Sequence, residues 1–320
     1  MQFDLRPMFA TLTDKPFDDP DWVFEMKWDG FRTIAVARSG HASLYSRNLN
    51  DISRKYPSVC QALAKIKDEA VLDGELVALD EHGRSRFQLL QNAEREPVRV
   101  LYCVFDLLYL DGKDLRGKTL LERKATLKRT LPKSPLLLYS EHVVGEGIKA
   151  FNRAKRANEE GVMAKLASSQ YHSGVRTREW LKVKASEEQE VVIVGFTEPR
   201  RSRKYFGALV LAVREGKGWK YAGRAGTGFN AETLRSVHEK LVPLITDVKP
   251  VPEKVPDAAN TTWVRPKLVA EVKFTEWTSA GEMRHPVSLG LRTDKPATEV
   301  IREKAKPLSE AKPARGARRH

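Results

Sequence analysis

The sequence of 320 residues predicts an α+β protein of two domains, with antiparallel sheets and flanking helices in residues 1–187 and a small β-barrel in residues 188–300. In the first part, strand-like and helix-like patterns alternate irregularly, unlike the regular β-α-β order of a doubly wound sheet. A charged stretch without apolar anchors, residues 185–189, then separates the two parts. In the second part, about five short strand patterns surround one helical pattern, which favours an OB-like barrel.

The elements of the first domain follow from hydrophobic periodicity. Residues 1–20 are punctuated by prolines and are expected to form an irregular lead-in. Strands are predicted where apolar residues alternate or form short runs, at residues 33–37, 42–46, 70–79, 99–109, 162–166 and 180–184. Helices are predicted where apolar residues recur at helical spacing, at residues 52–69, 87–94, 120–131 and 147–158.

The second domain is predicted to be mostly strand. Its strand patterns lie at residues 190–196, 207–214, 219–224, 267–274 and 288–291, and one helical pattern lies at 231–245. Residues 301–320 have no apolar periodicity, so a basic disordered tail is predicted there. From Arg302 onward seven basic residues stand against two acidic ones, which suits either a non-specific DNA-binding arm or a linker from a longer polypeptide.

Composition restricts the classes of function. The formal net charge is +14, which makes a polyanion such as nucleic acid the first partner to consider. The two cysteines, Cys60 and Cys103, have no second cysteine or histidine at metal-ligand spacing, so neither a disulfide framework nor a zinc site is expected. No apolar run reaches the length of a membrane helix, and the N-terminus lacks a signal-peptide layout. A cytoplasmic protein without a membrane partner is therefore expected.

The candidate site is organised around Lys27, in the stretch Glu25-Met26-Lys27-Trp28-Asp29-Gly30-Phe31-Arg32. This stretch lies between an apolar-aromatic run and a β-rich run, and Asp29-Gly30 provides turn chemistry, so Lys27 is expected at a strand edge or in a turn between strands. A Lys-x-Asp-Gly match alone also fits a plain surface cation. We interpret Lys27 as a covalent nucleophile because later stretches supply the groups that such a lysine needs.

Acidic residues on predicted strands are candidate metal ligands. Glu75 lies mid-strand among apolar neighbours, and Glu160 opens another strand. Buried carboxylates are costly unless they are paired or bound to a metal, and Mg²⁺ prefers oxygen ligands. A salt-bridged residue at a strand edge is an equally good interpretation of either residue alone.

Lys182 and Lys184 alternate along one predicted strand, so both side chains lie on one face while Leu181 and Val183 face the core. Such a face is often simply solvated. If it faces Lys27, it would bind phosphates and also tune the nucleophile. A cation about 6 Å away, at an effective dielectric constant of about 20, lowers the pKa of a lysine by about two units. That shift would raise the fraction of neutral amine.

These stretches occur in one order: Lys27-Trp28-Asp29-Gly30 with Arg32, Ser46-Arg47-Asn48, Asp73-Gly74-Glu75, Phe105-Asp106, Glu160-Gly161-Val162-Met163-Ala164-Lys165 and Lys182-Val183-Lys184. The ordered set resembles the motifs of the covalent nucleotidyltransferases, and most closely those of ATP-dependent DNA ligases of the bacterial LigD end-joining type. The resemblance continues through residues 221–229 and 263–266 and ends at 284–295.

The resemblance implies a nucleotidyltransferase domain followed by an OB-fold domain, with ATP as cofactor and Mg²⁺ or Mn²⁺ as metal. Lys27 would attack the α-phosphate of ATP, release pyrophosphate and hold AMP as a phosphoramidate. Glu25 would lie near the adenine, and Phe105 would stack on it. Arg32 and Glu75 would contact the ribose side.

The remaining motif residues would handle phosphates and the DNA. Arg47 would contact the nucleotide or the 5′-phosphate of a nick, Asp29 would act near the strand ends after adenylation, and Glu160 would help to hold the metal. Two further groups would bind phosphates: Lys182 and Lys184 the α-phosphate, and Arg292, Asp294 and Lys295 the pyrophosphate leaving group.

The implied reaction is the sealing of breaks with a 3′-hydroxyl and a 5′-phosphate in duplex DNA, at nicks or at ends. The implied partners are a bacterial Ku and polymerase or phosphoesterase domains, with the ligase itself a monomer. No separate DNA-binding domain is expected before residue 20, and a fragment of a larger protein and a stand-alone enzyme are both open. Val287-Ser288 departs from the basic or aromatic residues expected after Arg284-His285-Pro286.

Two other functions remain open on the sequence. The first is an RNA ligase or a GTP-using capping-type enzyme, which would share the covalent lysine. The second is a catalytically silent module that binds DNA ends. The presence of the lysine, both acids and the Lys182/Lys184 pair favours an active enzyme over the silent module.

Overall fold

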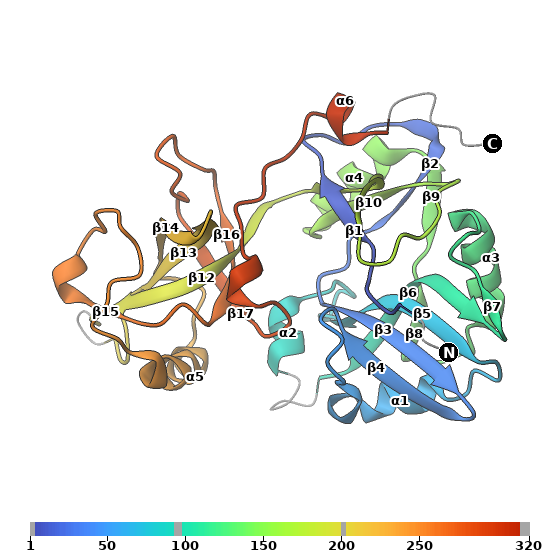
Figure 1. The fold of residues 1–320 in the computed structure, drawn as a ribbon, viewed down its shortest axis with the longest axis horizontal. Helices are drawn as coiled ribbons and strands as arrows, with labels where there is room; N and C mark the ends of the chain where they lie inside the picture. Colours follow the sequence, from blue (N-terminus) through green and yellow to red (C-terminus); the bar gives the residue numbers. More distant parts are fainter. Residues whose placement is uncertain (1–3, 93–97, 200–202, 314–320) are drawn as a thin grey trace. The chain divides into compact units, whose positions relative to one another are not determined.

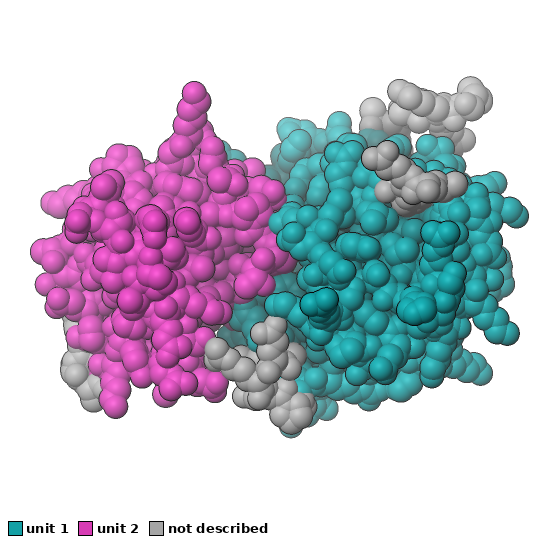
Figure 2. All heavy atoms as spheres, turned by 60° about the horizontal axis from the view of Figure 1, so that its bottom comes forward, with its two compact units in different colours: residues 1–185, 304–320 teal, residues 186–303 magenta. Residues whose placement is uncertain are grey.

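The computed structural model describes residues 4–92, 98–199 and 203–313, and the chain forms two compact units. Unit 1 comprises residues 1–185 and 304–320, and unit 2 comprises residues 186–303 (Figure 2). The chain therefore leaves unit 1 after Ala185 and returns to it at Lys304. Within the ranges described, no helix combines the length and the apolar character needed to cross a membrane.

Unit 1 contains two sheets (Figure 1). The first has the order β1-β11-β10-β2-β9, with β1 parallel to β11 and the other neighbours antiparallel. Its strands are β1 (Phe9–Leu12), β2 (Asp19–Met26), β9 (His142–Gly145), β10 (Gly161–Leu166) and β11 (Arg176–Lys184). The helix α4 (Gly147–Arg156) packs its apolar residues against one face of this sheet. Two strands thus begin within the expected irregular lead-in, residues 1–20.

The second sheet has the order β4-β3-β5-β6-β7, and β8 pairs in parallel with β6. Its strands are β3 (Phe31–Arg38), β4 (His41–Ser46), β5 (Ala70–Ala78), β6 (Val100–Leu110), β7 (Lys113–Asp114) and β8 (Leu137–Tyr139). Three α-helices belong to this part: α1 (Pro57–Leu63), α2 (Phe87–Asn92) and α3 (Leu120–Thr130).

The helix expected over residues 52–69 is shorter than predicted. Ser53–Lys55 forms a 3-10 turn, and α1 begins only at Pro57. Proline has no backbone N–H to donate and so favours the first turn of a helix over its interior. The helix α3 agrees better with its predicted range, because Thr119 and Glu122 form a capping box at its start.

The two sheets of unit 1 share a core. One buried cluster combines Val23 and Trp180 from the first sheet, and Met8 just before β1, with Ile34, Val71 and Phe105 from the second sheet. The rings of Phe105 and Trp180 meet edge to face, with their centroids 6.3 Å apart. Because residues from both sheets bury against one another, the sheets pack face to face, and the motif residues on their facing sides come close together.

Unit 2 is built on one sheet with the order β14-β13-β12-β16-β17, and β15 also pairs with β12. Its strands are β12 (Glu187–Thr197), β13 (Leu209–Glu215), β14 (Gly218–Ala225), β15 (Thr261–Trp263), β16 (Val269–Phe274) and β17 (Val287–Arg292). The helix α5 (Ala231–Leu241) packs Leu234, Val237 and Leu241 into the core of this unit. The fold therefore consists of one unit with two sheets and a smaller unit with one, mostly antiparallel sheet.

The expected closed barrel is not found in unit 2. No ladder joins β14 to β17 in the portion of unit 2 that the structure describes, and only a single parallel bridge, Thr227–Val287, links the chain near these two edges. The strand β15, which the sequence pattern missed, occupies the same edge of β12 as β16 does, opposite Gly195–Thr197. The strands and the helix are thus confirmed, whereas their closure into a barrel is not.

The prediction of a disordered tail over residues 301–320 is wrong for its first part. Lys306 forms a parallel bridge with Thr13, and its backbone exchanges hydrogen bonds with Leu12 and Asp14 at 3.0 and 3.1 Å. A short helix, α6 (Leu308–Ala311), adds Ala311 to the apolar cluster around Phe17 and Trp22. Lys312 then pairs with Asp19 at 2.6 Å. The segment that docks is too short for its apolar residues to show a periodic pattern in the sequence. Residues 314–320 lie outside the described residues.

We expect Lys312→Ala to destabilise unit 1 by about 1 kcal/mol, the size of a partly buried cation–π contact. The Lys312 ammonium lies 4.0 Å from the Phe17 ring centroid and 5.5 Å from that of Trp22. Thermal unfolding and the rate of tryptic cleavage after Lys304 measure the effect. Lys306→Ala is the matched control, because the exposed Lys306 contributes to docking through its backbone. Equal effects from both variants would contradict this account.

Candidate active site

Lys27 directly follows Met26, the last residue of β2, and so lies at the end of this strand. Its backbone N–H donates to the Gly161 carbonyl at 3.0 Å, which continues the pairing of β2 with β10. The Lys27 ammonium forms an ion pair with the Glu160 carboxylate, and both side chains are largely buried, with 18% and 8% of their surface exposed. The predicted position at a strand edge or in a turn between strands is confirmed, and one predicted metal ligand lies directly beside the predicted nucleophile.

The turn after Lys27 is fixed by its own sequence. Asp29 accepts a hydrogen bond from the Phe87 N–H at 3.0 Å, and its own N–H donates to Ser85 Oγ at 3.0 Å. A Cβ atom built on Gly30 would lie 2.0 Å from the Leu76 carbonyl oxygen, so only glycine allows this backbone approach. The Asp-Gly pair thus sets the turn that places Lys27, and Asp29 also anchors the start of α2.

The strands β2, β10 and β11 bring the basic motif residues to one face of the sheet. Met163 pairs with Glu25 on one side and with Lys182 on the other, and Gly161 pairs with Lys184. Paired residues and residues two positions apart share a face. Lys182 and Lys184 therefore share one face, as predicted, and Glu25 lies on that face too. Leu181 and Val183 are fully or nearly fully buried on the opposite side.

Glu25 lies at the centre of a buried ionic cluster. Its carboxylate contacts Lys124 Nζ at 2.9 Å and Lys165 Nζ at 3.0 Å, and it accepts a hydrogen bond from Ser140 Oγ at 3.1 Å. Burial alone would raise the pKa of Glu25, but the two lysines lower it below its usual value. Burial lowers the pKa of Lys165 to about 8, against the opposing pull of Glu25. Two buried cations therefore neutralise this carboxylate.

Arg32 is held by Asp73. Its Nε and Nη2 atoms each contact one Asp73 oxygen at 2.6 Å, and Nη2 also reaches the Met8 carbonyl at 3.3 Å. The Arg32 guanidinium lies 4.6 Å from the centroid of the Phe105 ring, and Lys165 Nζ lies 4.3 Å from the same centroid. Phe105 is 7% exposed. Its ring thus contacts two cations in this structure, and its stacking on a base stays a prediction.

The remaining predicted residues of unit 1 lie on neighbouring strands. Glu75 pairs with Arg32 across β5 and β3, so both occupy one face of the second sheet. Arg47 follows β4, with its guanidinium 4.6 Å from the Phe9 ring centroid. Arg176 lies 5.7 Å from the same centroid. Arg47 and Arg176 thus both contact the Phe9 ring, and the predicted contact of Arg47 with a phosphate stays a prediction.

Glu160 is suited to bind a divalent cation, both by the chemistry of its carboxylate and by its position next to Lys27. Its carboxylate is a hard oxygen donor beside Lys27, and Mg²⁺ is commonly bound by one or two carboxylates together with substrate phosphates. Glu75 is half-buried on β5. The assignment of Glu75 as a second ligand stays a prediction.

Arg292 and Lys295 belong to unit 2, whereas Lys27 belongs to unit 1. Arg292 contacts Asp294 and Glu271, each at 2.7 Å, and Lys295 forms an ion pair with Glu190. Burial would lower the pKa of Arg292, but Asp294 and Glu271 raise it well above its usual value. These side chains are held in an internal ionic network of unit 2, and their predicted role with pyrophosphate is not tested by this arrangement.

Some residues near the site escaped the sequence reasoning: Asp73, Lys124, Lys165, Tyr171 and Trp180. Lys165 and Asp73 lie inside the motifs named above, so their place in the ordered set could have indicated that they belong to the site. Lys124 lies on α3, where its pattern resembles that of a solvated helix face. Only the tertiary fold shows that it is buried and paired with Glu25.

Comparison with known proteins gives a consistent result. A family model described as "ATP dependent DNA ligase domain" matches residues 7–184, and one described as "ATP dependent DNA ligase C terminal region" matches residues 202–295. The multifunctional non-homologous end joining protein LigD of Pseudomonas aeruginosa is 39% identical over 98% of this chain and 38% of its own length. Its counterpart in Mycobacterium tuberculosis is 40% identical over 94% of this chain and 40% of its own length.

Shorter relatives and solved structures agree. A prophage-derived DNA ligase-like protein, LigB of Bacillus subtilis, is 33% identical over 61% of this chain and 72% of its own length. A solved structure of a mycobacterial DNA ligase D complexed with ATP and MES has a TM-score of 0.72 and 38% identity. That match covers 95% of this chain and the whole of the solved chain. The chain spans about two fifths of the LigD relatives it matches.

Proposed function

Because the chain belongs to the ATP-dependent DNA ligase family, we propose that it joins DNA strands through an AMP bound covalently to Lys27. The observation that carries this proposal is the grouping on one sheet face of Lys27, its partner Glu160 and the strand that bears Lys182 and Lys184. A nucleophile, a carboxylate for a metal and two cations for phosphate are the parts that adenylation requires.

Adenylation begins at the Lys27 amine. The neutral amine attacks the α-phosphorus of ATP, an N–P bond forms, and the P–O bond to pyrophosphate breaks. In the structure Glu160 pairs with Lys27, and Lys182 and Lys184 lie on the sheet face of Glu25. A Mg²⁺ or Mn²⁺ held by Glu160, with Glu75 as second predicted ligand, would neutralise phosphate charge and draw the carboxylate away from Lys27.

Two further steps complete the joining. An oxygen of the DNA 5′-phosphate attacks the AMP phosphorus, which breaks the N–P bond and frees Lys27. The 3′-hydroxyl of the adjacent strand then attacks the 5′-phosphorus and expels AMP. We assign contacts with the nucleotide to Glu25, Arg32, Phe105 and Arg47, and positioning of the strand ends to Asp29. Positioning and charge neutralisation carry most of the rate in such transfers.

The basic residues of unit 2 extend the proposal. Arg292 and Lys295 would turn toward pyrophosphate during the first step, exchanging Glu271 and Glu190 for phosphate oxygens. Arginine binds phosphate oxygens with the same charge-assisted hydrogen bonds that it makes to a carboxylate, so such an exchange needs no new type of contact.

The proposed context is bacterial repair of double-strand breaks by non-homologous end joining, in the bacterial cytoplasm. The support is the name and the identity of the LigD relatives, of which this chain matches about two fifths. Duplex DNA with nicks or ends is the proposed substrate. A bacterial Ku and polymerase or phosphoesterase domains are the proposed partners of a monomeric ligase unit.

The test is labelling followed by a chase. The protein is incubated with ATP or GTP labelled at the α-phosphate, and nicked duplexes of DNA or RNA strands are then added without nucleotide. We expect label from ATP alone and its transfer to the DNA 5′-phosphate before sealing. Labelling by GTP alone, or sealing of RNA alone, would replace the proposal by the capping-type or RNA-ligase alternative. Binding of DNA ends without any label would favour the silent module.

A further inference from the structure

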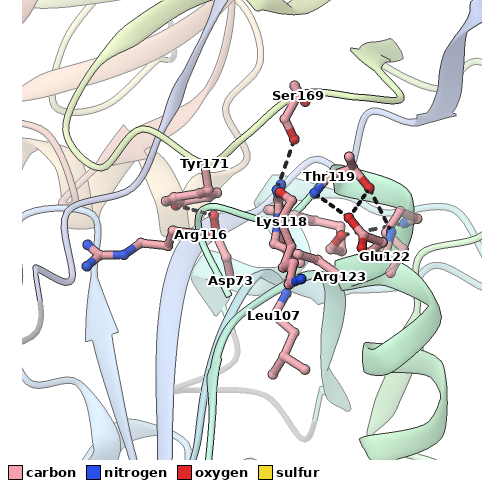
Figure 3. A network of polar contacts seen from close by, with 12 residues as sticks. Asp73, Leu107, Arg116, Lys118, Thr119, Glu122, Arg123, Ser169 and Tyr171 are labelled. Atoms are coloured by element: carbon pink, nitrogen blue, oxygen red, sulfur yellow. Dashed lines mark hydrogen bonds and ion pairs between the residues drawn. The ribbon is translucent and has the colours of Figure 1, made fainter. Parts of the chain in front are cut away.

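The Tyr171 hydroxyl makes two buried hydrogen bonds next to Arg32. It donates to Asp73 Oδ2 at 2.6 Å and accepts from the Met8 N–H at 2.9 Å. Figure 3 shows the Tyr171 side chain directed at Asp73 from the loop that follows β10. Tyr171 is 4% exposed and Asp73 is fully buried. The hydroxyl therefore has a fixed place with both of its contacts inside the protein.

Asp73 connects the Tyr171 hydroxyl to Arg32 through its carboxylate. The same oxygen that receives the Tyr171 hydroxyl also contacts Arg32 Nη2, and the other carboxylate oxygen contacts Arg32 Nε. Met8 closes the set, because its N–H donates to Tyr171 while its carbonyl accepts from Arg32 Nη2. Tyr171 and Asp73 thus join Arg32 to the Met8 N–H, in addition to the direct contact of Arg32 with the Met8 carbonyl.

Tyr171 is itself held rigidly. Its N–H donates to the Arg116 carbonyl at 2.9 Å, and its ring meets Trp180 edge to face, with centroids 5.8 Å apart. The Arg123 guanidinium lies 5.8 Å from the Tyr171 ring centroid. Arg123 in turn donates to the carbonyls of Lys118 and Ser169 (Figure 3). The ring therefore has little freedom to move its hydroxyl away from Asp73.

We propose that Tyr171 is a positioning residue for ATP binding, acting through Asp73 on Arg32. The inference rests on the proposed function, in which Arg32 contacts the nucleotide. A carboxylate with one hydrogen-bonded donor fewer can rotate about its side-chain bonds, so the guanidinium it holds samples more orientations. A hydrogen bond to a charged group is strong enough to change an equilibrium constant about tenfold.

Tyr171→Phe tests the proposal, since it removes the hydroxyl and keeps the ring. We expect the KM for ATP in the labelling reaction to rise about tenfold, with the maximal extent of labelling retained at saturating ATP. If Tyr171 has only a structural role, part of the variant protein is unfolded, so the maximal extent of labelling falls while the KM for ATP stays unchanged. That result would overturn the proposal.

Tyr102→Phe is the matched control. Tyr102 is also fully buried, and its hydroxyl bonds the carbonyls of Thr33 and Leu72, next to Arg32 and Asp73 in the chain, without bonding the Asp73 carboxylate. We expect its KM for ATP to match the wild type. An equal rise in both variants would overturn the proposal, because any lost hydroxyl would then suffice.

A second variant keeps the test valid if Tyr171→Phe does not fold. Asp73→Asn retains the side-chain shape but removes the charge that holds Arg32, so we expect a KM rise at least as large as for Tyr171→Phe. An unchanged KM in a folded Asp73→Asn protein would overturn the proposal. Absence of any label on the wild-type chain would overturn the proposed function itself, and this proposal with it.

Discussion

Replacing Lys27 with alanine is expected to abolish covalent labelling by ATP, because it removes the amine that is proposed to form the N–P bond. The effect should reach the background of the assay rather than a partial loss. DNA binding should change little, since phosphate contacts made by many basic residues dominate such binding. Gel-resolved label and a DNA-binding titration on the same preparation measure both quantities.

Two further variants make this result specific. Lys27→Arg keeps the positive charge beside Glu160 but has no amine that loses its proton near neutral pH, so it should also fail to label. Lys128→Ala removes an exposed lysine that pairs with Glu141 on the surface, and it should label normally. Retained labelling in Lys27→Ala would show that the nucleophile has been assigned to the wrong residue.

Arg123→Met is expected to destabilise unit 1 by about 3–5 kcal/mol, the usual cost of removing one partner from a buried ion pair. Arg123 and Asp106 have no exposed side-chain surface, and two hydrogen bonds of 2.7 and 2.8 Å join them. The variant leaves the Asp106 carboxylate buried without its cation. Urea unfolding followed by tryptophan fluorescence measures the change in the free energy of unfolding.

The double variant Arg123→Met/Asp106→Leu is the control for this prediction. Removing both charges avoids the uncompensated carboxylate, so much of the lost stability should return. Arg116→Met is a surface comparison, because Arg116 forms its ion pair with the half-exposed Asp114 and should cost less than about 1 kcal/mol. If Arg123→Met and the double variant are equally stable, the loss of stability does not come from an unpaired Asp106 carboxylate, which would contradict the prediction.

The sequence predicted the local features of this protein well. Alternation placed Lys182 and Lys184 on one face of a strand, and register confirms it. Asp29-Gly30 predicted a turn, and the 2.0 Å approach to the Leu76 carbonyl explains why glycine is needed. Each of these properties depends on residues close in sequence, and the physical rule that governs it has a short range.

Other features depend on residues far apart in the chain. Glu25 meets Lys165 across 140 positions, and Tyr171 meets Asp73 across 98, so neither contact has a local signature. The docking of residues 304–313 depends on an apolar cluster near the N-terminus, around Phe17 and Trp22. The pairing of β15 with the same edge of β12 as β16 likewise joins residues far apart in the chain, and strand propensity alone does not determine it.

The proposed reaction depends on the bond between the Lys27 amine and the phosphorus of AMP. The most direct measurement is mass spectrometry of peptides from protein incubated with ATP and Mg²⁺, with and without acid treatment. An acid-labile AMP group on the peptide that contains Lys27, lost when nicked DNA is added, is the expected result. AMP on a different lysine, such as Lys182 or Lys165, or a peptide with no AMP at all, would contradict the proposal.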